Sequence, residues 1–489
     1  MAKPISREFT WYEGLAFCVS AIGVQLSSEF VSQFGHYFYS PTVGGGRMVY
    51  ITIGFILPMF VIGRFFDAIT DPLAGLWSDE TPGKPGRWRL IPIHGRRRPF
   101  IFWGSILMTF TGIAYWYPPI PTTSTLNFVY GSVLLCLHFL FFTICVVPLV
   151  AMAPEVARSK QARIKLGVWI AVGMILGLAL AAGVSGTLID TFDPARRIPV
   201  EEGQPPSFSS LGYQRTAIVF SLVSLLTFQF VVWVVRERER EPERLPETSR
   251  TIRHAYRDMA EVMRNRVFLR YIAAIFLFSI GFLATQRVLP NWAEVGLGGD
   301  ESTVTLLMLP FIGSALVMAF AGMPILGRFL PVKWLLALSF IIIGTGLPLM
   351  YPVAALPMET GTRFLLGAML FGYCGLGQGM QYVLLTPMLG EIIDLDEQQS
   401  GRRREGSYNG VNTMAIKAGQ ALSIAVSNVC MSTFGNSVEN PTGILLVGPM
   451  AGIFAVLGLA VVWGYPVLHV TRETTEELVS EEPDIPIGR

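Results

Sequence analysis

The sequence contains few charged residues and few cysteines for its length. Asp, Glu, Lys and Arg together make up only 15% of its 489 residues, whereas 52% are hydrophobic. A composition this apolar excludes a soluble protein built from several domains. Every cysteine lies in an apolar stretch, where a thiol behaves as a small hydrophobic side chain, so neither a disulfide framework nor a metal site is expected. The five cysteines are Cys18, Cys136, Cys145, Cys374 and Cys430.

Several motifs of soluble enzymes are absent from the sequence. It contains no G-x-x-x-x-G-K-[ST] phosphate loop, and no segment between its apolar runs is long enough to hold a nucleotide-binding domain. It also has no cluster of His, Cys and carboxylate residues with metalloenzyme spacing, and no nucleophile paired with a base. We therefore expect no enzymatic activity, no cofactor and no nucleic-acid partner. Any transport would draw its energy from an ion gradient.

Long apolar runs dominate the chain instead. A helix of about 20 apolar residues crosses the hydrocarbon core of a bilayer, and the sequence holds twelve runs of this kind. They predict an all-α integral membrane protein with twelve transmembrane helices. The runs cover residues 11–38, 48–76, 99–118, 126–152, 164–190, 213–235, 268–293, 302–327, 332–352, 362–390, 407–435 and 442–469.

Lys and Arg are concentrated in alternate loops. The segments that follow the even-numbered runs are basic, and the opposite loops carry few basic residues. Because basic loops stay on the cytoplasmic side of a membrane, both termini are expected in the cytoplasm. We expect a monomer in the lipid bilayer of the cell (inner) membrane.

The order of the runs predicts two halves. Six spans, a polar linker and six more spans form the plan of the major facilitator fold, in which substrate binds near the midplane between the halves. On this plan the N-terminal six-helix half covers residues 1–235, the cytoplasmic linker 236–266, the C-terminal six-helix half 267–470 and a cytoplasmic tail 471–489.

The second apolar run carries three charges close together. Arg64, Asp67 and Asp71 lie within eight residues, and one charge near the centre of a bilayer costs about 2.5–3.5 kcal/mol on insertion scales. At about 100° per residue they share a helix face with Thr70, so this face is expected to point into the protein. One interpretation is structural, with an ion pair between Arg64 and Asp67. The other is a functional site, which intramembrane charges usually mark.

A cation site explains the spacing of the two carboxylates. Asp67 and Asp71 are four residues apart, so they repel each other on a helix when both are ionised, and a cation or a proton relieves the repulsion. Pro72 has no N–H and leaves the carbonyl of Ala68 without its helical partner. Carboxylates, this carbonyl and the Thr70 hydroxyl are hard oxygen ligands that suit a hard cation. The expected coupling ion is Na+ or H+, with Asp67 and Asp71 as the ligands of Na+.

Other polar residues inside the apolar runs predict a cavity. Lys417 lies deep in the eleventh run, where an ammonium group needs a counter-charge, and the carboxylates of the second run are the obvious candidates. For a single Gln or Asn, helix–helix hydrogen bonding is the alternative. The residues expected to line the substrate cavity are Gln25, Glu29, Gln378, Gln381, Tyr382, Thr413 and Gln420. Further polar residues of the first and seventh runs are Ser32, Gln33, His36, Arg287, Asn291 and Glu294.

Charges also gather at the predicted cytoplasmic ends of two runs. Glu391 and Asp394 lie at the end of the tenth run, and Arg97 and Arg98 belong to the basic loop after the second. Salt bridges between the two groups would close a cytoplasmic gate between the halves. The alternative is ordinary solvated charge at a membrane interface.

Two blocks of the sequence resemble a known family. One lies between Arg64 and Phe100 and includes RFFDAITDPLAGLWSDET and GRRRPF, and the other lies between Met388 and Ala421 and includes MLGEIIDLDE and GSYNGVNTMAIKAGQA. Both are similar to the glycoside–pentoside–hexuronide:cation symporters, the melibiose-permease group of the major facilitator superfamily. The resemblance implies a cation-coupled symporter that works by alternating access. It implies cation binding by Asp67, Thr70 and Asp71, coupling by Arg64 and Lys417, and a position beside the sugar for Tyr382.

The sequence departs from melibiose permease where that protein holds its sugar. The alignment puts Val146 and Ala171 at the positions of an aspartate and an arginine that bind sugar hydroxyls, and Gln25 near a third such residue. A buried hydroxyl without a partner is strongly penalised. With Val146 and Ala171 in the cavity, the substrate is expected to be a differently recognised sugar or glycoside, or a related small solute. The alternatives are a sodium-dependent symporter of lysophospholipids or other amphiphiles and, from another class, a non-transporting membrane sensor.

Overall fold

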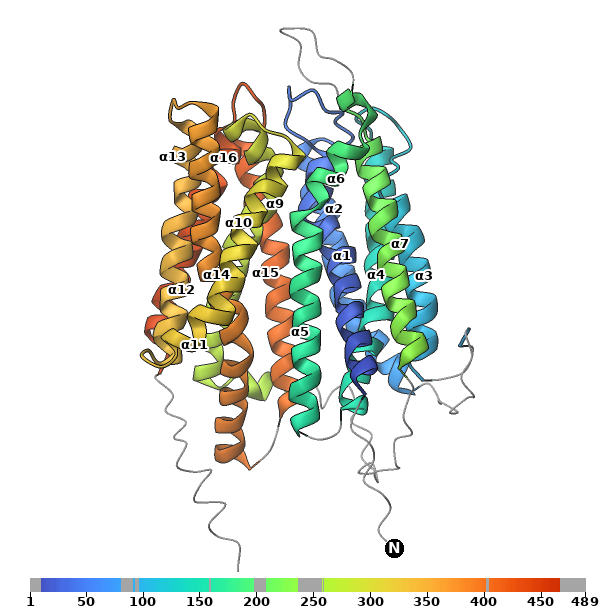
Figure 1. The fold of residues 1–489 in the computed structure, drawn as a ribbon, viewed down its shortest axis with the longest axis vertical. Helices are drawn as coiled ribbons and strands as arrows, with labels where there is room; N and C mark the ends of the chain where they lie inside the picture. The colour runs from blue at the N-terminus through green and yellow to red at the C-terminus, as the bar shows by residue number, and fades with distance from the viewer. Residues whose placement is uncertain are drawn as a thin grey trace, which may run out of the picture.

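The protein is a bundle of long helices that run side by side (Figure 1). A computed structural model describes residues 10–80, 91–92, 96–157, 160–197, 208–235, 257, 259–401 and 404–466. Over these residues the only β-pairing is an isolated bridge between Val43 and Ser437. The end of the bundle where α1 begins is called the Trp11 end below. The opposite end, with the loop between α1 and α2, is called the Arg47 end.

The N-terminal half is the group of helices from α1 to α7. In it α1 packs against α5 and α7, α2 against α4, and α3 against α4 and α7. The elements are α1 (Trp11–Tyr39), α2 (Ile53–Glu80), α3 (Arg98–Ala114), α4 (Thr125–Val156), α5 (Lys160–Gly183), α6 (Ser185–Phe192), the 3-10 helix η1 (Pro194–Arg197) and α7 (Leu211–Val234).

The C-terminal half is the group of helices from α9 to α16. In it α9 packs against α15 and α16, α10 against α14, and α12 against α14 and α16. The elements are α9 (Arg266–Leu297), α10 (Glu301–Val317), the π-helix η2 (Met318–Gly322), α11 (Met323–Leu326), α12 (Val332–Gly346), the 3-10 helix η3 (Leu347–Leu349), α13 (Met350–Ala355), α14 (Thr360–Ser400), α15 (Glu405–Phe434) and α16 (Thr442–Trp463).

The membrane-spanning character predicted from the sequence is confirmed. Ten helical segments of the described residues are long and apolar enough to cross a membrane. Two more helices, α3 with 17 residues and α14 with 41, stand where the third and tenth spans are predicted. The all-helical structure is therefore consistent with twelve spans. Most of the predicted linker and the whole predicted tail fall outside the described residues, so the domain boundaries stay a prediction.

The helices are fixed by caps and by close contacts at small residues. The side chain of Asn265 accepts the first free N–H groups of α9, and Gly298, with φ of 66°, ends that helix in the left-handed region that favours glycine. Helix α5 touches α1 at Gly173, where a Cβ would lie 2.0 Å from the carbonyl oxygen of Cys18. Such contacts let membrane helices approach closely. The two halves meet where α1 contacts α9, where α2 contacts α15, and where α5 and α6 contact α10.

Candidate functional site

A buried ion-pair cluster connects the two halves in the middle of the bundle. Lys417 of α15 lies between the two carboxylates of α2, with its Nζ 3.0 Å from Asp67 Oδ2 and in contact with Asp71 Oδ2. Asp67 is almost fully buried, whereas the side chains of Lys417 and Asp71 are 20% and 28% exposed. The counter-charge that the sequence requires for Lys417 is therefore the pair of carboxylates expected to bind the cation.

The hydroxyl of Thr143 on α4 completes this cluster. Its Oγ1 lies 3.1 Å from Asp67 Oδ1 and 2.8 Å from Asp71 Oδ1, in donating geometry to both. Nothing in the sequence marks Thr143 as a site residue, because one hydroxyl in an apolar run is ordinary for a membrane helix. Two carboxylates and a hydroxyl are a donor set of hard oxygens. The set fits a small hard cation.

Two predicted members of the cation site make weaker contacts with it. The hydroxyl of Thr70 donates to the backbone carbonyl of Asp67, at 3.2 Å, rather than to a carboxylate. Arg64 lies 3.8 Å from Asp67 Oδ2 and 3.4 Å from the Ser32 hydroxyl, and its guanidinium sits over the ring of Phe139. Arg64 is thus near the cluster but makes only long contacts, whereas the Thr70 hydroxyl hydrogen-bonds to the backbone of its own helix.

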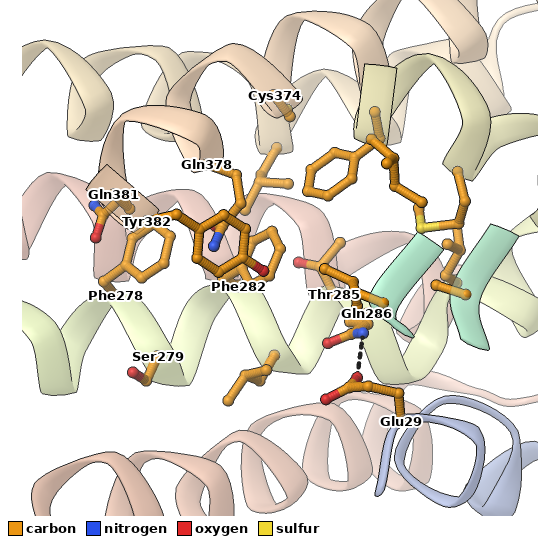
Figure 2. Close-up of a pocket in the computed structure, with 18 of the residues that line it drawn as sticks. Glu29, Phe278, Ser279, Phe282, Thr285, Gln286, Cys374, Gln378, Gln381 and Tyr382 are labelled. Atoms are coloured by element: carbon orange, nitrogen blue, oxygen red, sulfur yellow. Dashed lines mark hydrogen bonds between the residues drawn. The ribbon is translucent and has the colours of Figure 1, made fainter. Parts of the chain in front are cut away.

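A cavity of about 240 Å³ lies between the halves, close to the middle of the bundle. Figure 2 shows polar side chains and aromatic rings directed into it from α1, α9 and α14. Of the residues predicted to line the cavity, those that do so are Gln25, Glu29, Gln378, Gln381, Tyr382 and Gln420. The aromatic lining residues are Phe278, Phe282, Phe311, Phe371 and Tyr382.

Glu29 has a special position in this cavity. Among the described residues that line the cavity, Glu29 is the only acidic one, and none is Lys, Arg or His. Its carboxylate accepts a hydrogen bond of 3.0 Å from Gln286 of α9, in the opposite half (Figure 2). Gln286, like Phe278 and Phe282, follows the same face of α9 at intervals of four residues. Nothing in the sequence marks these three as cavity residues, because aromatic residues at helical spacing in a membrane span usually indicate packing and a single Gln usually indicates helix–helix hydrogen bonding.

Three residues expected in the cavity lie elsewhere. Val146 packs on the apolar cluster inside the N-terminal half, and Ala171 of α5 is exposed. Thr413 lies one turn before Lys417 and is also exposed. The assignment of Val146 and Ala171 came from an alignment, and a position in an alignment does not fix the direction in which a side chain points.

The charges at the Trp11 end form contacts inside each half. Arg97 is 3.1 Å from Glu155, and Arg98 donates to the Val232 carbonyl. In the other half Arg404 bonds Asp396 at 3.0 Å. Glu391 is half-buried and Asp394 exposed. The predicted gate of Arg97 and Arg98 with Glu391 and Asp394 therefore stays a prediction.

At the Arg47 end the halves are joined by a network that the sequence analysis did not predict. Glu301, the first residue of α10, accepts two bonds of 2.9 Å from Arg47, one of 3.0 Å from Arg196 and one of 2.7 Å from the Tyr213 hydroxyl. Arg47 also pairs with Glu294 of α9. Burial alone lowers the pKa of Arg47, but the neighbouring acidic groups more than offset this and raise the pKa above its usual value. Arg47 therefore stays charged, and the network closes the interface at this end.

Comparison with known proteins identifies the family. The sequence matches the family described as MFS/sugar transport protein over residues 16–468. An uncharacterised symporter of Synechocystis sp. is 24% identical over 81% of this chain and 82% of its own, and the isoprimeverose transporter of Lactiplantibacillus pentosus is 20% identical over 87% and 81%. The fold is similar to that of the inward-open xylose transporter XylE of E. coli, with a TM-score of 0.60, 13% identity and coverage of 96% of this chain and 98% of that one. The chain belongs to the melibiose-permease-like glycoside–pentoside–hexuronide:cation symporter family of the major facilitator superfamily and is a membrane transporter, not an enzyme.

Proposed function

We propose that this transporter is a cation-coupled symporter of a sugar, a glycoside or a related polyhydroxylated solute, working by alternating access. The observation that carries the proposal is the position of Lys417 between Asp67 and Asp71. The single positive charge of the ammonium group bridges two carboxylates, and another cation of equal charge can take its place there. A bound cation would therefore release Lys417, which is a tie between the halves.

Each residue of the cluster has a role in this exchange. Asp67 and Asp71 would hold the cation, and the hydroxyl oxygen of Thr143 would turn a lone pair toward it. Arg64 would move toward Asp67 when that carboxylate is not occupied by Lys417 or a cation, because the present contact of 3.8 Å is long enough to shorten. Na+ is the proposed ion, since a proton needs only one carboxylate whereas a metal ion uses several oxygens. H+ is the alternative, and the two are separated by experiment below.

The lining of the cavity favours a polyhydroxylated solute over a lipid. Amide side chains and one carboxylate offer hydrogen-bond donors and acceptors, and flat aromatic rings pack against the C–H faces of a small ring. No arginine is among the described residues that line the cavity, so this lining does not favour an anionic substrate. Isoprimeverose, the substrate named for a relative, is the first compound to test.

The sidedness of the molecule follows from the positions of its basic loops. In the sequence, basic residues follow the even-numbered spans, and α2, which is one of these spans, ends at the Trp11 end. The positive-inside rule therefore assigns that end to the cytoplasm. The Arg47 end then faces outward. We propose a monomer in the inner membrane with both termini in the cytoplasm and no cofactor besides the coupling ion.

Uptake into proteoliposomes tests the proposal. Purified protein is reconstituted, and an inward gradient of either Na+ or H+ is imposed while uptake of isoprimeverose, xylose, melibiose and a lysophosphatidylcholine is followed. Cation-driven accumulation of a sugar supports the proposal. Accumulation of the lysolipid alone would favour the amphiphile symporter, and saturable binding without accumulation would favour a sensor. Accumulation driven by H+ and indifferent to Na+ would identify the ion as a proton.

A further inference from the structure

A strip of polar side chains runs along the contact between α1 and α9, from the central cavity to the Arg47 end. It starts at the cavity with the hydrogen bond between Glu29 and Gln286. It ends at the network of the Arg47 end, where the Tyr37 hydroxyl donates to Glu294 at 2.8 Å. Both end points are bonds between the two halves. The strip therefore follows the interface along which the halves must separate for the cavity to open toward the Arg47 end.

The middle of the strip consists of Gln33 and His36 from α1 and Arg287 and Asn291 from α9. The two residues of each pair are three or four positions apart, so they share one face of their helix. All four are buried, with at most 3% of their surface exposed. His36 and Arg287 are close enough to interact electrostatically. The four residues are called the sealed polar strip below.

The sealed polar strip contains buried polar atoms without hydrogen-bond partners. Among the described residues, nothing bonds the two amide atoms of Gln33, the two ring nitrogens of His36, one terminal nitrogen of Arg287 or the amide oxygen of Asn291. Buried polar groups in folded proteins are nearly always paired, and an unpaired one needs an explanation. Six such atoms along one contact are unfavourable in this conformation, and a hydrogen-bonding ligand that reached them would give them partners.

Few contacts hold the strip in its present state. Arg287 Nε donates to the Ser423 hydroxyl at 3.1 Å, and Asn291 Nδ2 donates to the Thr42 hydroxyl at 3.1 Å. The charged groups that act on Arg287 are Arg64, which repels it, and Glu29. No carboxylate forms an ion pair with Arg287 among the described residues. Its guanidinium therefore keeps donor capacity for a ligand.

We propose that the sealed polar strip is an outer subsite for the transported solute, which binds there after the halves part at the Arg47 end and before it reaches the central cavity. The inference rests on the proposed function. The strip offers amide, imidazole and guanidinium donors together with amide and imidazole acceptors, which is the mixture that a polyhydroxylated solute needs. An acyl chain would leave every one of these groups unpaired, so the same strip disfavours a lipid substrate.

Chemical modification of His36 tests whether the strip opens. Diethyl pyrocarbonate modifies accessible imidazole nitrogens, and mass spectrometry reports each histidine separately. His138 is the matched control, because it is equally buried but lies inside the N-terminal half, bonded to the Ser27 carbonyl. Glu301→Gln weakens the network at the Arg47 end, and Arg47→Gln is a second variant should the first not fold. Both are compared with the wild type in nanodiscs.

We expect Glu301→Gln to raise the modification rate of His36 severalfold and to leave the modification rate of His138 unchanged. Isoprimeverose at a saturating concentration should then protect His36. Equal increases at both histidines would indicate general loosening and would overturn the inference. The inference would also be overturned if His36 stayed unreactive in both Glu301→Gln and Arg47→Gln. It would be overturned as well if His36 became reactive but was not protected by a sugar that the same protein transports.

Two substitutions test the binding role directly. Gln33→Leu and Asn291→Leu remove polar groups from the strip at similar volume. Ser20→Ala is the control, since Ser20 is buried on α1 and its hydroxyl donates to the Phe17 carbonyl of the same helix. The KM for isoprimeverose uptake should rise severalfold in both variants, with Na+ affinity unchanged, and stay normal in Ser20→Ala. Normal KM values would overturn the subsite. Failure of the proposed function is distinguishable from failure of the subsite inference, because the wild type itself would then show no cation-driven uptake of sugar.

Discussion

Replacement of Lys417 by alanine should separate cation binding from transport. In the wild type a cation must displace the ammonium group from Asp67 and Asp71 before it can occupy them. Lys417→Ala removes this competitor and leaves two adjacent carboxylates with only the more distant Arg64 as a counter-charge among the described residues. The site should then bind Na+ more tightly, while concentrative uptake is lost because cation binding no longer breaks a tie between the halves.

The size of the effect follows from the contacts of Lys417. A hydrogen bond between charged groups contributes about 1.5–3 kcal/mol, and each 1.4 kcal/mol or so is a tenfold change in affinity. Lys417 is 20% exposed and Asp71 28%, so water weakens one contact, whereas Asp67 is shielded. We therefore expect the Na+ dissociation constant to fall about 10- to 100-fold.

Calorimetric titration of Na+ into purified wild type and Lys417→Ala at one fixed pH measures this change. Lys333→Ala is the control, because Lys333 of α12 is a partly exposed lysine of the same half that donates to the Trp463 carbonyl and does not belong to the cluster. The control should leave Na+ affinity and uptake as they are. Unchanged or weaker Na+ binding in Lys417→Ala would refute competition, and normal accumulation would show that Lys417 is only structural.

Three further predictions concern other parts of the molecule. Thr143→Val should weaken Na+ binding about tenfold by loss of one oxygen ligand, with sugar binding in the absence of Na+ unchanged; equal Na+ affinity by calorimetry would exclude Thr143 as a ligand. Phe282→Ala should raise the KM for sugar about three- to tenfold through lost ring contacts, and an unaltered KM would mean that the solute binds elsewhere. Single cysteines at Ser249, which lies outside the described residues, and at Thr123 should label from opposite sides of the membrane in a cysteine-free background. Labelling of both from outside would contradict the topology.

The charged part of the site could be predicted from the sequence, because charge inside a membrane span is costly enough to demand a partner. Asp67, Asp71 and Lys417 stand out in apolar runs for this reason. The structure brings together these three from spans two and eleven, which are far apart along the chain. The polar residues of the first span that the pattern assigned to the cavity, Gln25 and Glu29, also line it.

The neutral part of the site could not be predicted in the same way. Thr143, Phe282 and Gln286 carry no penalty in a membrane helix, so their types alone do not distinguish a ligand from a packing residue. Their importance depends on which helices are neighbours, and only the fold supplies that. Arg47 and Glu301 were missed for another reason. Charges next to loops are normally solvated, and the sequence does not reveal that these two are buried against each other.

The two proposed ligands act on different ties between the halves, which suggests why both are needed for transport. In the proposed mechanism the cation would compete with Lys417 for Asp67 and Asp71, and a solute that binds Glu29 in the cavity would compete with Gln286 for it. Each ligand alone would release one tie and leave the other in place. A ligand shifts a conformational equilibrium only by its difference in affinity for the two states, so release of both ties gives a larger shift than release of either. Obligatory coupling then requires no direct contact between cation and solute.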